Sequence, residues 1–168
     1  TLYLNTDHLV DEAGNETFTI GTRTIPLHKS IEVAIESDHY LKQKDRVAVY
    51  RSVGPMYTYV GGEWINGRVH FTTREFGDFV FLKDSVPPTI SPLAVTRQGV
   101  RLRIKDSLSG ISSYQASING QWLLMNYDNK SNTLSSKLLD PASPLKGDFE
   151  LTVTDNAGNQ TKYFKKIL

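Results

Sequence analysis

Short stretches of alternating apolar and polar residues recur along the whole chain. They are rich in Val, Ile, Thr, Tyr and Phe, and Gly, Asn, Asp or Pro interrupts them about every 8 to 12 residues. No window of a dozen residues holds a convincing apolar period of 3.6, the period that an amphipathic helix requires. The pattern therefore predicts an all-β fold.

The first half of the chain predicts a series of short strands. They are expected near residues 1–5, 17–22, 30–37, 46–52, 56–60, 62–65, 68–73 and 78–82.

Two dipeptides predict tight turns at the centre of this half. Gly61 with Gly62, and Asn66 with Gly67, are pairs that accept the positive φ of a two-residue hairpin loop. If both are hairpins, Tyr59 faces Trp64 across one turn, and Trp64 faces Val69 across the other. The resulting face is expected to be the core face, with Tyr57, Tyr59, Trp64, Val69 and Phe71 on it.

The second half shows the same alternation with a charged outer face. Val100, Leu102 and Ile104 alternate with Arg and Lys, which predicts a half-buried strand. Further alternating stretches lie at residues 114–118 and 149–153, and a last strand is expected over 160–167. Six or seven short antiparallel strands in about 80 residues are typical of an immunoglobulin-like or fibronectin-like sandwich.

A proline-rich junction separates the two halves. Three prolines fall within residues 84–92. Proline donates no backbone hydrogen bond and fixes φ, so this segment cannot be a central strand and is expected to be a stiff, extended connector. The sequence therefore predicts two tandem β-sandwich domains of the immunoglobulin or fibronectin kind, at residues 1–86 and 87–168.

Composition excludes several classes of function. The formal net charge is +1 and no run of Lys or Arg occurs, so a nucleic-acid partner is not expected. No apolar run is long enough to cross a bilayer, and the absence of cysteine excludes disulfides and thiol chemistry. Because the chain starts abruptly on an expected strand, we expect it to be a fragment of a longer protein whose targeting signal lies outside it.

The sequence offers no catalytic motif. The histidines, His8, His28, His39 and His70, do not have the spacing of a zinc site, and neither a nucleophile elbow nor a phosphate-binding loop occurs. We therefore predict no catalytic, cofactor-binding or metal-binding residue in this chain, and no enzymatic activity of its own.

Two loops have the composition of calcium sites. Residues 106–110 and 155–159 combine Asp, Asn or Ser with glycine. The favoured interpretation is that these side chains bond to the backbone of their own turns, and that glycine supplies the positive φ.

Trp122 and Leu124 are the candidate interaction surface. If Asn119 and Gly120 form a two-residue turn, Leu123 and Met125 point inward, and Trp122 and Leu124 point to the opposite face. One bulge residue would reverse this assignment. Two large apolar groups on a wet face are expected to be covered by the first domain, by a loop over residues 138–146, or by a second chain.

The order and spacing of several motifs resemble a known family. The second half resembles the C-terminal region of secreted lysostaphin-like zinc endopeptidases of Bacteroidetes, and the first half resembles the module that precedes it there. The resemblance is carried by residues 87–90, 104–111, 113–114, 118–125, 127–128 and 151–159 in the second half, and by residues 2–4, 61–64 and 76–77 in the first.

The resemblance implies an accessory role. In the family, an upstream peptidase domain holds zinc through His-x-x-x-Asp and His-x-His motifs and cuts peptidoglycan cross-links, but neither motif occurs here. The chain would then be the non-catalytic C-terminal arm of an extracytoplasmic peptidase. It would position the enzyme or contact peptidoglycan or an envelope protein.

The alternative interpretation is a carbohydrate-binding or adhesive module. Five aromatic side chains could form a stacking platform: Tyr57, Tyr59, Trp64, Trp122 and Tyr127. A shallow surface row of aromatics beside hydrogen-bonding groups would favour this alternative, and aromatics buried between sheets would favour the peptidase arm.

Overall fold

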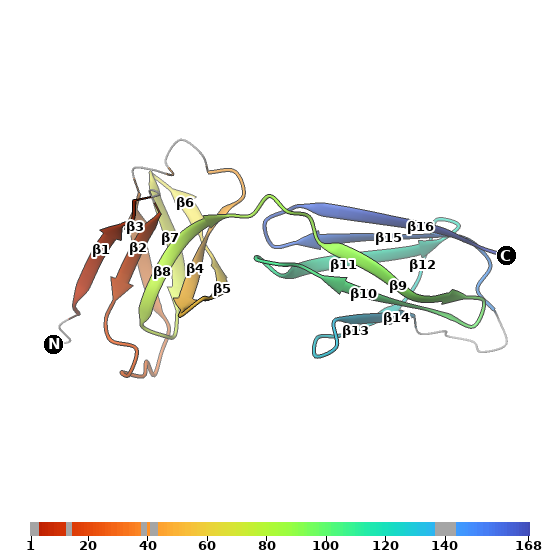
Figure 1. Ribbon diagram of the computed structural model, residues 1–168, viewed down its shortest axis with the longest axis horizontal. Helices are drawn as coiled ribbons and strands as arrows, with labels where there is room; N and C mark the ends of the chain where they lie inside the picture. Colours follow the sequence, from red (N-terminus) through yellow and green to blue (C-terminus); the bar gives the residue numbers. More distant parts are fainter. Residues whose placement is uncertain (1–3, 13–14, 38–39, 41–43, 137–143) are drawn as a thin grey trace. The chain divides into compact units, whose positions relative to one another are not determined.

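The computed structural model describes residues 4–12, 15–37, 40, 44–136 and 144–168 (Figure 1). The chain divides into two compact units, Thr1–Ser85 and Val86–Leu168. Throughout the described residues the regular elements are β-strands, every pairing is antiparallel, and no helix occurs. The all-β prediction is therefore confirmed.

The first unit is built from two sheets. One has five strands in the order β1-β2-β8-β4-β5, and the other has three in the order β3-β7-β6. Their bounds are β1 Thr6–Val10, β2 Glu16–Ile20, β3 Ile31–Glu36, β4 Val47–Val53, β5 Met56–Gly61, β6 Glu63–Ile65, β7 Arg68–Thr73 and β8 Gly77–Lys83. The prediction of a strand over residues 1–5 is wrong at residues 4 and 5, because β1 begins at Thr6. Residues 1–3 of that predicted strand lie outside the described part.

Both sheets contribute side chains to one apolar core. Val49, Phe79 and Phe81 come from the five-stranded sheet, Val69 and Phe71 come from the other, and each is at most 5% exposed. The alternation that predicted these strands is what turns these residues inward, because successive side chains of a strand point to opposite faces.

The two predicted turns of this unit differ in outcome. Asn66 and Gly67 form the expected hairpin, with Trp64 opposite Val69. Gly61 and Gly62 do not form a hairpin: β5 pairs with β4 in the five-stranded sheet, whereas β6 pairs with β7 in the other. At this point the chain therefore crosses from one sheet to the other.

This crossing separates the aromatic residues that were expected to face one another. Tyr59 lies opposite Tyr50 with its ring edge-on, at a centroid distance of 5.5 Å, and Trp64 stacks on Phe81 at 5.9 Å. Both Tyr59 and Trp64 are half-buried, and Tyr57 is 47% exposed. The prediction that Tyr59 and Trp64 are buried partners, with Tyr57 on the same core face, is wrong because the two residues belong to different sheets.

The second unit also contains two sheets, each of four strands. Their orders are β13-β14-β10-β9 and β12-β11-β15-β16. The bounds are β9 Thr89–Thr96, β10 Gly99–Lys105, β11 Ile111–Ile118, β12 Gln121–Trp122, β13 Met125–Asp128, β14 Thr133–Ser136, β15 Gly147–Asp155 and β16 Gln160–Ile167. Leu102, Ile104 and Leu134 from the first sheet and Leu151 and Val153 from the second form a core in which each is fully buried.

The proline-rich segment is only partly a connector. Its last residues, Thr89 to Pro92, belong to β9, so the prediction of a connector as far as Pro92 is wrong at this end. Pro92 is tolerated because β9 is an edge strand. The register against β10 also shifts here: Leu102 lies opposite Pro92 and Arg101 opposite Ala94, which leaves Leu93 as the bulge residue.

The crossing at Gly62 can be tested by substitution. A Cβ at Gly62 would lie 2.6 Å from Val69 Cγ1, and φ is +120°. We expect Gly62→Ala to lower the free energy of unfolding by about 2–4 kcal/mol, because backbone strain and overpacking add. The matched control is Gly54→Ala, where φ is +58° and no heavy atom lies within 4 Å, so only about 1 kcal/mol is expected. Equal losses in urea denaturation would contradict this explanation.

Candidate binding surface

A tight hairpin presents Trp122 on the outer face of the second unit. Asn119 and Gly120 form the predicted two-residue turn, with φ of 50° and 78°, and Ile118 pairs with Gln121. Trp122 lies opposite Ser117 and is 67% exposed. The indole therefore stands on the side of the sheet that faces away from the core.

Leu124 is not part of this strand. β12 ends at Trp122, and the chain then crosses to the other sheet, where β13 begins at Met125. Leu123 packs against the core and Leu124 is half-buried in the crossing. The alternation that would place Leu124 beside Trp122 therefore stops after Trp122. The loop expected as a cover, residues 138–146, lies outside the described residues except for its last three.

The strand register aligns Trp122 with one residue on each of the other three strands of its sheet. Trp122 lies opposite Ser117, Ser117 opposite Glu150, and Glu150 opposite Phe164. Residues directly opposite in antiparallel strands project on the same face. Phe164 is 63% exposed. Two exposed aromatic rings therefore stand on the two edge strands, and three strand spacings put their backbones about 14 Å apart.

Polar side chains occupy the space between and beside the two rings. Lys162 Nζ lies 4.0 Å from Glu150 Oε1, and Lys166 Nζ lies 3.9 Å from Asp148 Oδ1. Gln115 and Thr152 form a parallel row with Lys162, two residues along each strand. Donors and acceptors are thus spread over the surface, and the nearby charges are mutually balanced.

Two shallow hollows lie on this face. One of about 380 Å³ is bordered by Trp122, Gln115, Thr152 and Lys162, and another of about 530 Å³ is bordered by Phe164. Exposed aromatic rings and hydrogen-bonding side chains therefore lie side by side around these hollows. We call the face defined by Trp122, Ser117, Glu150 and Phe164 the aromatic row.

The two loops with calcium-like composition meet in the second unit. Asn156 donates from its backbone to Gly110 O and from its side chain to Ser109 O, and carboxylate oxygens of Asp106 and Asp155 lie within 4.8 Å of each other.

The carboxylates in these loops bond to the backbone of their own turns. Asp106 Oδ2 accepts from the amides of Leu108 and Gly110, and Asp155 Oδ1 accepts from the amide of Asn159. The turn-stabilising interpretation accounts for these contacts.

His8, whose side chain is 46% exposed, lies beside the buried polar pair Glu16 and Ser37. His8 stacks on Phe18 at 4.3 Å, and its Nε2 lies 3.3 Å from Glu16 Oε1, while Ser37 donates to Glu16 Oε2. Burial and the charge of Glu16 raise the pKa of the Tyr40 hydroxyl nearby. Ser37 is 1% exposed, so its hydroxyl, which donates to the Glu16 carboxylate, lies beneath the protein surface.

The other histidines have varied places. His28 is exposed and His70 is half-buried on β7, whereas His39 lies outside the described residues.

Among the described residues, no helix is long and apolar enough to span a bilayer.

Comparison with known families identifies the first unit. Residues 1–84, half of the chain, match the family described as the Zu5-like domain. The chain belongs to the Zu5-like domain family. A search of curated proteins found no match.

Two solved structures were found to be similar to the Zu5-like chain. Both are expansins of Clavibacter michiganensis, one a mutant in complex with cellohexaose and the other in the apo form. Each is 13% identical and covers 82% of this chain and 76% of its own, with TM-scores of 0.38 and 0.37. None of the proteins named here is a lysostaphin-like peptidase, so that resemblance stays a prediction.

Phe164 was not predicted from the sequence as part of the candidate interaction surface. It lies in the stretch Tyr163, Phe164, where two adjacent aromatics must point to opposite faces of a strand. Tyr163 packs against the core, so Phe164 must face outward. That alternation is the signal that could have identified it.

The exposure of Trp122 can be measured by fluorescence. In a Trp64→Phe background, Trp122 is the remaining tryptophan, and we expect acrylamide to quench it readily because it is 67% exposed. The matched variant Trp122→Phe leaves Trp64, which stacks on Phe81 and lies beneath the Lys44 ammonium at 5.3 Å. Its quenching constant should be several-fold lower. Similar constants in the two variants would show that Trp122 is covered.

Proposed function

We propose that this chain is a non-catalytic module that binds a linear polysaccharide through the aromatic row of its second unit. The observation that supports this most directly is the alignment of Trp122 and Phe164 on one sheet face with Ser117 and Glu150 between them. The proposal takes up the carbohydrate-binding alternative and not the arm of a peptidase.

The chemistry of the row fits a sugar polymer. An aromatic ring carries partial negative charge on its face, which attracts the slightly positive C–H groups of a pyranose ring. Rings set about 14 Å apart can hold a short stretch of polymer at both ends. Between them, Ser117 and Glu150 offer a hydroxyl and a carboxylate to sugar hydroxyls.

The exposure of the two rings also favours a ligand. Trp122 is 67% and Phe164 is 63% exposed, so both rings are accessible to a ligand, and each carries a large apolar surface next to polar groups. A bound polymer that covers both rings would remove their apolar surface from water, which favours binding.

We also infer that each unit is a β-sandwich of the immunoglobulin or fibronectin kind. This inference is supported by the two antiparallel sheets and the shared core of each unit. In such folds one sheet face packs on the core and the other is wet, and the wet face of β12-β11-β15-β16 is where the proposed ligand binds.

Binding assays with variants of Trp122 and Phe164 test this proposal. Co-sedimentation with insoluble cellulose, chitin and peptidoglycan sacculi should show retention on at least one of these polymers. We expect Trp122→Ala and Phe164→Ala each to weaken retention by about tenfold, equivalent to about 1.4 kcal/mol. Both should keep the melting temperature of the parent chain, because both side chains are more than half exposed. No soluble sugar should be released.

The matched control is Tyr57→Ala. Tyr57 is an aromatic residue of the first unit that is 47% exposed, and its loss should leave retention unchanged. Failure of the parent chain to be retained on any of the three polymers would reject the proposal, as would equal retention of the Trp122→Ala and Phe164→Ala variants.

The association with an upstream peptidase remains a separate prediction from the resemblance. It implies that the parent protein is extracytoplasmic and carries His-x-x-x-Asp and His-x-His motifs before these residues. The sequence of the full gene product tests it directly, and absence of both motifs would contradict it. Peptidoglycan would then be the first polymer to examine in the assay above.

A further inference from the structure

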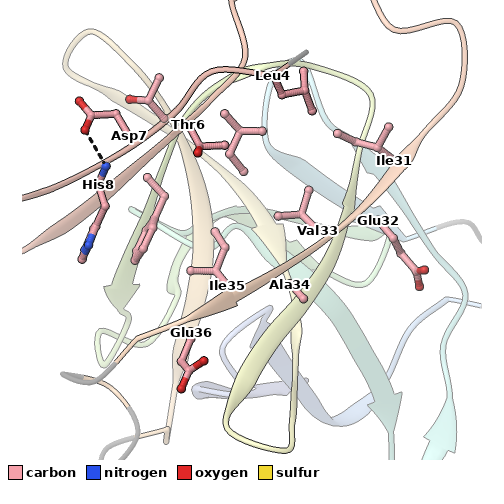
Figure 2. A pocket seen from close by; sticks show the side chains of 13 residues that line it. Leu4, Thr6, Asp7, His8, Ile31, Glu32, Val33, Ala34, Ile35 and Glu36 are labelled. Carbon is pink, nitrogen blue, oxygen red and sulfur yellow. Dashed lines mark hydrogen bonds between the residues drawn. The ribbon is translucent and has the colours of Figure 1, made fainter. Parts of the chain in front are cut away.

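A groove on the first unit lies between the free edges of its two sheets. It has a volume of about 590 Å³ and is lined by residues of β1, β2 and β3 (Figure 2). β1 ends the five-stranded sheet and β3 ends the three-stranded sheet, and within the described residues neither strand has a partner on its outer side. Each therefore presents unpaired backbone groups along the groove.

The floor of the groove is apolar. Phe18, Ile31 and Val33 belong to the margin of the core, yet each is only half-buried. Figure 2 shows Val33 on one side of β3 and Glu32 on the other. An added strand that continued the sheet from β3 would therefore place alternate side chains over this floor.

The charges of the groove have one sign. Asp7, Glu32 and Glu36 line it, and its lining includes no Lys or Arg, although the whole chain has a net charge of +1. Arg68 Nε lies 3.3 Å from Glu36 Oε2. Glu32 is exposed and has no ion pair among the described residues. The remaining negative charge is suited to a cationic side chain of a bound partner.

We propose that the groove binds an extended segment of a partner protein in which apolar and basic residues alternate. The segment pairs with the free edge of β3, as in recognition by strand addition. Its apolar side chains cover Ile31 and Val33 beside the stacked rings of His8 and Phe18, and its basic side chains lie beside Glu32 and Glu36 on the outer face of the sheet. This site is independent of the polysaccharide surface proposed for the second unit.

A synthetic probe tests the charge and the pattern. The probe is a fluorescein-labelled peptide of alternating lysine and valine, blocked at both ends and as long as β3, which has six residues. The control peptide carries glutamate in place of lysine. In anisotropy titrations of the full chain, we expect saturable binding of the lysine peptide and at least about tenfold weaker binding of the glutamate peptide.

Charge reversal on the protein gives the decisive comparison. Glu32→Lys should weaken the lysine peptide by about tenfold and strengthen the glutamate peptide. The matched control Glu63→Lys changes an exposed acid on β6, at the opposite edge of the same sheet, and should leave both affinities unchanged. Equal effects of the two variants, or indifference to peptide charge, would overturn the proposal.

Strand pairing has its own test, because only alternate residues of an added strand bond to a given edge. N-methylation of one alternate set of peptide amides should abolish binding, and methylation of the other set should be tolerated. Tolerance of both sets would overturn strand addition. Sedimentation of the free chain tests another occupant: a dimer that Glu32→Lys dissociates would assign the groove to a second copy and overturn the partner proposed here.

Discussion

The first unit depends on a two-residue step at which its chain changes sheets. Gly61 and Gly62 have φ of 92° and 120°, and Gly62 passes so close to Val69 that no side chain fits between them. β5 and β6 lie in different sheets although only Gly62 separates them in sequence. Val69, in turn, is a fully buried member of the core that the two sheets share.

The two units differ in how completely the apolar residues at the side of the core are covered. In the second unit the chain crosses between sheets at Leu123, which packs against the core. In the first unit the chain passes from β2 to β3 over residues 21–30, yet Phe18, Ile31 and Val33 remain half-buried on the side bordered by β1 and β3. The same apolar residues that stabilise a core by being covered are available to a partner where the cover is missing.

Local sequence was sufficient to predict most strands, and two of the three turns. Asn66 with Gly67, and Asn119 with Gly120, favour the hairpin conformation so strongly that the register follows from the dipeptide alone. Gly61 with Gly62 permits a hairpin and a crossing alike, because glycine adopts positive φ at little cost in either.

The partners of Tyr59 and Trp64 depend on which sheet each strand joins, and that is decided by distant residues such as Val49 and Phe81. The aromatic row could be predicted only in part for the same reason: Trp122 follows from a turn, but its alignment with Phe164 requires the order of four strands.

Pro92 and the bulge at Leu93 have a consequence for crowded assemblies. They interrupt β9, the outer strand of one sheet of the second unit, so a strand from a neighbouring molecule cannot extend that sheet with regular pairing. A polymer with repeating sugar units would bring many copies of the chain side by side at high local concentration. Under those conditions an uninterrupted edge at β9 would favour aggregation by strand pairing, and the proline and the bulge hinder such pairing at this edge.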